Sequence, residues 1–263
     1  MRDNNAVVVI QFDKGYYEWG KTLVQSLLFN APDDKVVIYS VNLSRSQRNE
    51  LISLHKNLTI HNRRIPFISN KFKRHFMANR KANIFLRAIK NYDAKYYVLL
   101  DADMILINPI NMLINTCTNF CAGLVYREYE IGYHMKLNAS LIIINKYKGG
   151  ERLIKEWVKT MRSNLLLKTV SDNLNIINII RNKKTPYVFP VRVRKGSWFW
   201  DQLTLFYAAE KLKNEIKHLP VDVYLNSSFD VNAVLWSAHS GDKNIALQTY
   251  QDTIKEFAKK SPQ

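Results

Sequence analysis

Two aspartates are the clearest candidates for chemistry in this sequence. Asp101 and Asp103 follow the apolar run Tyr96–Leu100 and precede a second apolar run, Met104–Ile107. This context places the two carboxylates at the end of a buried strand, where they are costly without a cation or a basic partner. Carboxylate oxygens suit Mg²⁺ or Mn²⁺, and these ions in turn bind phosphate oxygens. The pair therefore predicts a divalent-metal site that serves a phosphate-bearing ligand.

Predicted strands and helices alternate through the first half of the chain, and this order must position the aspartates. Ser44 and Gln47 have the spacing of a capping box, so a helix is expected to start there and run to about His55. The other expected elements are strands at Ala6–Gln11, Lys35–Val41, Leu58–His61 and Tyr96–Leu100, and helices at Tyr17–Phe29 and Phe76–Asn91. This alternation is typical of a doubly wound α/β sheet, in which ligands bind beyond the carboxyl ends of the strands.

The second half of the chain is less regular. Strands are expected at Phe120–Arg127, Asn138–Asn145, Tyr187–Val193 and Val234–Ala238, and helices at Gly149–Leu166, Ser171–Arg181, Asp201–Leu212 and Ala246–Lys259. The chain has only 8 Gly and 7 Pro and no linker-like stretch, which argues against a hinge between independent domains. We therefore expect one α/β domain over residues 1–263.

The positive charge of the chain is concentrated in two stretches. The formal net charge is +17, and no Asp or Glu occurs between Leu51 and Tyr92 or between Asn173 and Trp200. These stretches hold ten and six Lys or Arg residues, respectively. Such concentration favours a polyanionic partner, which can be a phosphate-bearing substrate, an anionic membrane surface or nucleic acid. A solvated basic face without a partner is the alternative.

Several other classes of protein are disfavoured by the sequence. Neither G-x-G-x-x-G nor G-x-x-x-x-G-K-[ST] occurs, so dinucleotide and P-loop sites lack their glycines. Cys117 and Cys121 are too few for a disulfide scaffold or a cysteine zinc site. No apolar run approaches the roughly 20 residues of a membrane-spanning helix, and Ala6–Ile10 is too short for a signal-peptide core. We expect a cytoplasmic protein, or one held at the inner face of a membrane by its basic stretches.

Five segments together resemble glycosyltransferases of the GT-A fold, with family 8 and related bacterial enzymes as the nearest type. The resemblance begins with Tyr97–Met104, which is similar to the family's D-x-D segment. Four more segments occur in the family's order: Val7–Gln25, Leu137–Asn145, Trp200–Gln202 and His239–Lys243. They are similar to the nucleoside-binding first strand, the N-A-G strand, the D-Q helix start and the C-terminal H-x-x-G-x-x-K motif. The sequence departs from the family at Ser140, where Gly is usual, and in the last motif, which is two residues shorter.

The resemblance implies a Rossmann-like GT-A domain with a mixed, mostly parallel central sheet flanked by helices. Its nucleotide-binding half would be about 1–110, its sugar and acceptor half about 111–245, and its C-terminal helix 246–260. Metal ligands are implied at Asp101, Asp103 and His239. Donor contacts are implied at Gln11, Asp13, Tyr16, Arg80, Lys81, Asp101, Ala102 and Lys243. The remaining catalytic positions are Asn138, Asp201 and Gln202.

Some of these residues have a simpler alternative role. Asp201 suits a helix N-cap, and Asn138 suits the start of a strand. The aromatic run of Trp198, Phe199 and Trp200 is either a stacking wall for an acceptor sugar or part of the core. These alternatives stay open at the level of sequence.

The function that follows is a glycosyltransferase dependent on Mn²⁺ or Mg²⁺. The resemblance implies a nucleotide diphosphate sugar as donor, a UDP-sugar above all, with retention at the anomeric carbon. The acceptor is expected to be a cell-envelope or lipid-linked glycan. Two alternatives are a nucleic-acid-binding or nucleic-acid-modifying protein, which the charge favours, and a sugar-1-phosphate nucleotidyltransferase.

Overall fold

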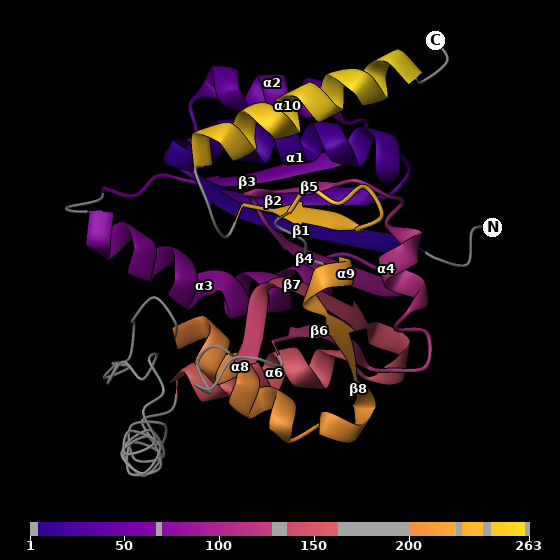
Figure 1. The fold of residues 1–263 in the computed structure, drawn as a ribbon. Helices are drawn as coiled ribbons and strands as arrows, with labels where there is room; N and C mark the ends of the chain where they lie inside the picture. The colour runs from indigo at the N-terminus through magenta and orange to yellow at the C-terminus, as the bar shows by residue number, and fades with distance from the viewer. Residues whose placement is uncertain are drawn as a thin grey trace, which may run out of the picture.

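A seven-stranded sheet forms the centre of the computed structural model (Figure 1), with the strands in the order β3-β2-β1-β4-β7-β6-β8. The structure describes residues 5–66, 70–127, 136–162, 200–224, 228–238 and 243–260. Six strands run in one direction, because only β7 pairs antiparallel with both of its neighbours. This mixed, mostly parallel sheet confirms the predicted fold class.

The first four strands are the parallel part that the sequence predicts. They are β1 (Ala6–Asp13), β2 (Lys35–Val41), β3 (Leu58–Arg63) and β4 (Tyr96–Asp101). Almost every side chain of β1, β2 and β4 is buried, as expected for strands covered on both faces. All four therefore end at one edge of the sheet, and Asp101 is the last residue of β4.

The remaining strands come from the second half of the chain. In the large sheet they are β6 (Ala122–Tyr126), β7 (Leu137–Asn145) and β8 (Ile216–Pro220). A separate antiparallel pair consists of β5 (Met104–Leu106) and β9 (Leu235–Ser237). The edge strand β8 was not expected from the sequence, because only two of its five side chains are buried and its pattern is not alternating.

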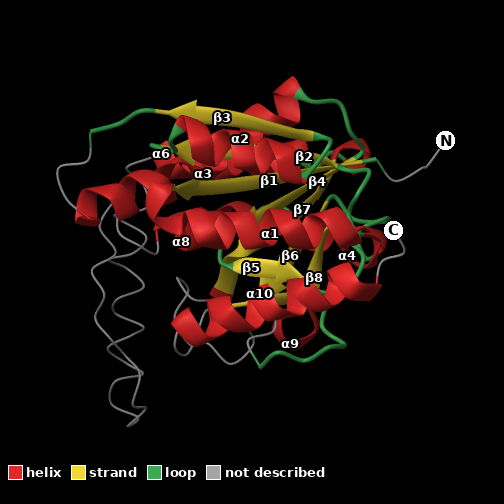
Figure 2. Cartoon of the chain, turned by 90° about the horizontal axis from the view of Figure 1, so that it is seen from above, coloured by secondary structure: helices red, strands yellow, loops and turns green. Residues whose placement is uncertain are grey.

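Helices cover both faces of the sheet (Figures 1 and 2). One face carries α1 (Tyr17–Asn30), α2 (Arg45–Leu54) and α4 (Asn111–Asn115), and the other carries α3 (Asn70–Asn91), α6 (Glu151–Arg162) and α8 (Trp200–Glu210). The chain also forms α9 (Val221–Tyr224), α10 (Lys243–Lys260) and the 3₁₀ turns Lys14–Tyr16, Lys146–Lys148 and Lys213–Glu215. Alternation along β1 divides the core, since Val7 and Val9 pack under α3 whereas Val8 and Ile10 pack under α1.

Local sequence signals set several of the helix boundaries. Ser44 accepts a hydrogen bond from the Gln47 amide and donates its own amide to the Gln47 side chain, so the predicted capping box at the start of α2 is confirmed. Helix α3 begins six residues before the expected start, and α10 begins three residues before it. The short helices α4 and α9 were not predicted.

Some sequence predictions fall outside the described residues. These are the helix Ser171–Arg181, the strand Tyr187–Val193, and the side chains of Trp198, Phe199 and His239. The division of the chain into two functional halves also stays a prediction, although both halves contribute strands to the same sheet. Among the helices that the structure describes, none has both the length and the apolar character needed to cross a membrane.

Candidate functional site

The carboxyl ends of β1 and β4 bring the first candidate residues together. Gln11 and Asp101 are paired positions on these neighbouring parallel strands. Asp103 lies in the turn that follows Asp101 and leads into β5. The edge of the sheet at which ligands bind in doubly wound folds therefore carries both aspartates.

Lys81 joins three elements at this edge. Its Nζ lies 2.8 Å from Oδ1 of Asp101 on β4 and 3.4 Å from Oδ2 of Asp201 on α8. It also donates a hydrogen bond to the carbonyl of Ala139 on β7, over 3.4 Å. Burial alone would lower the pKa of Lys81, but the two carboxylates outweigh burial and raise it, so the ammonium stays charged. The structure thus places Lys81, Asp101 and Asp201 in one ionic cluster.

The start of α8 holds Asp201 in place. The indole Nε1 of Trp157 on α6 donates to the Asp201 carbonyl over 3.0 Å, and the Thr204 hydroxyl donates to the Trp200 carbonyl over 2.6 Å. The Asp201 side chain is only 7% exposed, and its carboxylate also accepts from the Gln202 amide over 2.9 Å. Burial raises the pKa of Asp201 above its ordinary value, although Lys81 opposes the effect. Asp201 is therefore a buried carboxylate fixed by its neighbours on three elements.

A second ionic cluster forms around Asp103. The Nζ of Lys243, the first residue of α10, lies 3.1 Å from Oδ2 of Asp103 and 3.3 Å from the Tyr16 hydroxyl. The same ammonium stands 5.2 Å from the centre of the Tyr16 ring, a cation–π arrangement. Partial burial alone would lower the pKa of Lys243, and the Asp103 carboxylate outweighs it and raises the pKa. Residues from opposite ends of the chain therefore meet at the D-x-D segment.

An aromatic cluster anchors the helix that presents Lys243. Tyr250, two turns further along α10, is fully buried and packs edge-on against Trp19 of α1 with ring centres 5.7 Å apart. Phe229 and Trp236 complete the cluster. Because Lys243 and Tyr250 are seven residues apart, they lie on the same side of α10. Packing of the aromatic cluster therefore directs Lys243 toward Asp103.

Two glutamines of the predicted site carry buried oxygens without a partner among the described residues. Gln11 donates through Nε2 to the Met77 carbonyl of α3 over 3.0 Å, and its Oε1 is unpaired. Gln202 Oε1 is likewise buried and unpaired. An unpaired buried carbonyl costs free energy, so these two oxygens are candidates for ligand contacts.

Three other predicted residues have clear structural roles. Asp13 is 5% exposed, and its carboxylate caps the turn Lys14–Tyr16 by accepting from the Gly15 amide over 2.6 Å. Asn138 accepts from the Ser140 amide over 2.9 Å, where the pairing of β6 with β7 changes register. Ala102 is 5% exposed, in the turn between the aspartates.

Arg80 points to a different environment from that of Lys81. Its guanidinium lies 4.9 Å from the centre of the Phe76 ring on the same helix. Burial lowers the pKa of Arg80, and the nearby charges of Arg63 and Arg87 lower it further. Of the two adjacent bases predicted to contact the donor, only Lys81 touches the candidate carboxylates.

His239 lies outside the described residues, but the preceding residue is placed. The amide of Ala238 donates to the Asp103 carbonyl over 3.0 Å, and Ser237 pairs with Met104 across β9 and β5. The chain that leads to His239 therefore runs beside Asp103. In the described part of the chain, no group of three or more His, Cys, Asp or Glu residues is arranged to hold a metal ion.

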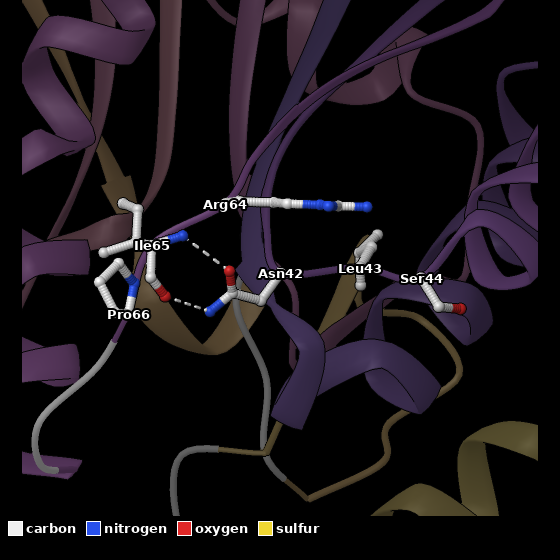
Figure 3. Close-up of a pocket in the computed structure, with 6 residues that line it drawn as sticks. All are labelled: Asn42, Leu43, Ser44, Arg64, Ile65 and Pro66. Carbon is white, nitrogen blue, oxygen red and sulfur yellow. Dashed lines mark hydrogen bonds between the residues drawn. The ribbon is translucent and has the colours of Figure 1, made fainter.

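A cavity of about 410 Å³ opens at the same edge of the sheet, at the ends of β2 and β3 (Figure 3). Asn42 lines one wall and has left-handed backbone geometry, with φ of 61°. Its side chain exchanges two hydrogen bonds with the backbone of Ile65, over 2.7 and 2.8 Å. Figure 3 shows the Arg64 side chain extended beside this pair of hydrogen bonds, toward Leu43 and Ser44. No predicted site residue lines the cavity.

Sequence reasoning missed the groups that orient the ionic clusters. Trp157, the Ala139 carbonyl and the Met77 carbonyl hold Asp201, Lys81 and Gln11, respectively. Trp157 had only the signature of an apolar helix face, and backbone carbonyls leave no mark in a sequence. These partners depend on tertiary contacts.

The likeness of this chain to known proteins lies in its structure and not in its sequence. No protein-family model matches the chain, and no curated protein matches it by sequence. The structure resembles the galactosyltransferase LgtC, solved with donor and acceptor sugar analogues, with a TM-score of 0.57 and 13% identity over 95% of each chain. It also resembles the bifunctional WbbM (TM-score 0.54, 15% identity, 98% of this chain and 52% of that one). A third neighbour is GlyE of Streptococcus pneumoniae (TM-score 0.53, 12% identity, 98% of this chain and 64% of that one).

These identities are too low to transfer an activity, but the coverage is nearly complete for this chain. The mixed, mostly parallel sheet with helices on both faces matches the fold that the five-segment resemblance implies. The chain therefore has the GT-A fold of the glycosyltransferases LgtC, WbbM and GlyE.

Proposed function

We propose that the protein is a metal-dependent glycosyltransferase that moves a sugar from a nucleotide diphosphate sugar, a UDP-sugar, to a glycan or lipid-linked acceptor. One observation carries this proposal. Two ionic clusters, Lys81 with Asp101 and Asp201 and Lys243 with Asp103, lie at the carboxyl edge of a GT-A sheet. Together the clusters hold three carboxylates and two ammonium groups, so one further positive charge would balance them. A bound cation together with the two lysines would suit the negative charge of a diphosphate.

The carboxylates fit a divalent ion in their chemistry. Asp101 and Asp103 offer hard oxygen ligands, which suit Mn²⁺ or Mg²⁺, and His239 would be a third ligand through a neutral imidazole nitrogen. The side chain of Asp103 is 14% exposed and that of Asp101 is 29% exposed, so both are reachable. A bound ion would neutralise charge that develops on the departing nucleoside diphosphate.

Side chains of the protein would bind the rest of the donor. Lys243 would bind the diphosphate once it leaves Asp103, and its positive charge would stabilise the leaving group. Lys81 contacts both Asp101 and Asp201 and would hold them in place beside the donor. The unpaired oxygens of Gln11 and Gln202 would accept hydrogen bonds from hydroxyls of the donor. We propose retention at the anomeric carbon as the stereochemical outcome.

A thermal-shift screen of nucleotide sugars with and without Mn²⁺ tests the proposal. Ligands that bind the native state raise the melting temperature by mass action, so a UDP-sugar with Mn²⁺ should raise it more than either one alone. Asp103→Asn should lose this joint effect. Asp252→Asn, an exposed carboxylate on α10 paired with Lys255, is the matched control and should keep it.

Two outcomes count against the proposal. If no nucleotide sugar raises the melting temperature of the wild type in the presence of Mn²⁺ or Mg²⁺, the donor assignment fails. If Asp103→Asn and Asp252→Asn both show the same joint rise in melting temperature as the wild type, the metal assignment fails and the donor assignment stands.

A further inference from the structure

A group of three arginines lies where the edge strand β3 meets α3, outside the ionic clusters described above. Arg80 and Arg87 are seven residues apart on α3 and therefore on the same side of the helix. Arg63 is the last residue of β3. Arg63 and Arg87 are exposed, and Arg80 is partly buried.

The packing of β3 against α3 explains why these arginines converge. His61 stacks on Tyr39 of β2 with ring centres 4.9 Å apart, and its Nε2 lies 2.7 Å from the hydroxyl of Tyr92, just after α3. These contacts direct His61 to the face of the sheet that α3 covers. Arg63 is two residues further along the strand and shares that face. The charges of Arg63 and Arg87 are close enough to lower the pKa of Arg80, in agreement with this placement.

No carboxylate balances this group within the described residues. The chain has no Asp or Glu between Leu51 and Tyr92, which includes all of β3 and α3. None of the ion pairs between described residues involves Arg63, Arg80 or Arg87. Mutual repulsion of three guanidinium groups is unfavourable, and an anion bound between them would relieve it.

A buried hydroxyl near Arg87 also lacks a partner among the described residues. Tyr39 is 5% exposed, and its hydroxyl has no hydrogen-bond partner among the described residues. Burial raises the pKa of Tyr39 to about 12, and Arg87 is near enough to oppose the rise. The hydroxyl therefore remains protonated and free to donate to an anion that the arginines hold.

We propose that Arg63, Arg80 and Arg87, with the Tyr39 hydroxyl, form a binding site for a phosphate or diphosphate group on the acceptor. This inference rests on the proposed glycosyltransferase function. Guanidinium groups bind phosphate oxygens in pairs through their fixed fork of donors, which makes arginine the fitting residue for such a group.

The position of the site relative to the candidate donor cleft supports an acceptor in particular. Lys81, which contacts Asp101 and Asp201, is the residue next to Arg80 on α3. The Met77 carbonyl, less than one turn before Arg80, holds Gln11 at the end of β1. Tyr39 of β2 and Gln11 of β1 are paired positions, so a molecule held by the arginines and Tyr39 would lie alongside the site where the sugar is transferred.

Titration with inorganic pyrophosphate in buffer of low ionic strength without divalent metal tests the site. The double variant Arg63→Gln/Arg87→Gln should weaken pyrophosphate binding by about tenfold or more, because each substitution removes charge-assisted hydrogen bonds. Arg45→Gln/Arg48→Gln on α2, which covers the opposite face of the sheet, changes the net charge equally and should stay within about twofold of wild type. Melting curves of both variants check that the fold is retained, which is expected since Arg63 and Arg87 are exposed.

A second arm uses vesicles to identify the source of the phosphate. Binding to phosphatidylglycerol vesicles but not to phosphatidylcholine vesicles, lost in Arg63→Gln/Arg87→Gln alone, would support a lipid headgroup. Loss confined to pyrophosphate would support a soluble phosphorylated acceptor. Equal loss in both double variants, or no binding of either probe by wild type, would overturn the site, and tighter arginine-dependent binding of single-stranded RNA would overturn its assignment to an acceptor.

The two proposals fail separately. Binding of UDP with Mn²⁺ reports on the donor cleft and does not require the arginines. If UDP binds and pyrophosphate does not distinguish the two double variants, the acceptor site is wrong and the donor site stands. The reverse result would leave an anion site on a protein that does not use this donor.

Discussion

The ammonium of Lys243 lies 3.1 Å from Oδ2 of Asp103. Lys243 thereby occupies a carboxylate oxygen that the proposed metal would need. A divalent ion at Asp103 would displace the ammonium and release it toward the donor. Under the proposed function, the ion pair would couple the two binding events, and the metal would bind before the donor.

Lys243→Ala should separate these two effects. We expect the variant to bind Mn²⁺ more tightly, because Asp103 is freed, and to bind UDP about tenfold more weakly in the presence of Mn²⁺. Calorimetric titration of each ligand measures both constants. Lys255→Ala, on the exposed side of the same helix, is the control. Stability should change by less than about 1 kcal/mol because the Lys243 side chain is half exposed.

If Lys243→Ala weakens the binding of both Mn²⁺ and UDP, the lysine supports the site without competing with the metal for Asp103. If it changes neither constant, the lysine is a surface residue and the shortened C-terminal motif has no part in donor binding.

Lys81→Met should be the most destabilising change in the cleft. The Lys81 side chain is 12% exposed and that of Asp201 is 7% exposed, so removal of the ammonium leaves the buried Asp201 carboxylate without its counter-charge. The expected loss of unfolding free energy is about 3 kcal/mol or more, measured by urea denaturation at pH 7.5. Lys81→Arg keeps the charge and should lose less.

A double variant shows whether the loss comes from the buried carboxylate. Lys81→Met/Asp201→Asn should recover part of the stability, because the amide needs no counter-charge. The assignment of the Lys81–Asp201 pair would be wrong if the two substitutions simply added.

The fold was largely predictable because its signals are local. Strands β1, β2 and β4 are continuous apolar runs, and the capping box at Ser44 marks the start of α2. Edge strand β8 was missed because an edge strand buries few side chains and its residues resemble a loop.

Site residues were predictable as types, but their contacts were not. Asp101 was expected to bind a metal, yet in this structure it pairs with Lys81, and nothing in the sequence joins Lys81 to Asp201 on a distant helix. The role of Asn138 in closing the irregular pairing of β6 and β7 depends on a register shift that no periodicity reveals. These contacts arise only when the second half of the chain adds its strands and helices to the first.

His55 should make the stability of the protein depend on pH below neutrality. The ring is 2% exposed, its Nδ1 accepts from the Asn57 amide, and its Nε2 lies 3.3 Å from the Ala31 carbonyl, so the neutral ring satisfies both contacts. Burial lowers the pKa of His55 below its ordinary value of 6.5. Near pH 6.5, His55 therefore binds a proton in the unfolded chain but stays neutral in the folded protein. The free energy of unfolding falls as the pH drops through that value.

Urea unfolding at pH 7.5 and pH 5.0 measures this dependence. His55→Gln, which cannot titrate, should lose stability at pH 7.5 and show a smaller further loss at pH 5.0 than wild type. Equal losses between the two pH values in both proteins would contradict the role of His55.

Gln202→Ala should lower activity without lowering stability. The Oε1 of Gln202 is buried without a hydrogen-bond partner among the described residues, so its removal relieves an unfavourable term and leaves the free energy of unfolding within about 1 kcal/mol of wild type. The backbone amide of Gln202 still donates to Asp201, so the start of α8 is kept. If the oxygen accepts a hydroxyl of the donor sugar, turnover of a UDP-sugar should fall by about tenfold to a hundredfold, while binding of UDP alone, which has no sugar, should be unchanged. Gln248→Ala, on the exposed side of α10, controls for a general effect of the substitution. A variant that loses stability but keeps turnover would show that Gln202 supports the fold rather than the donor.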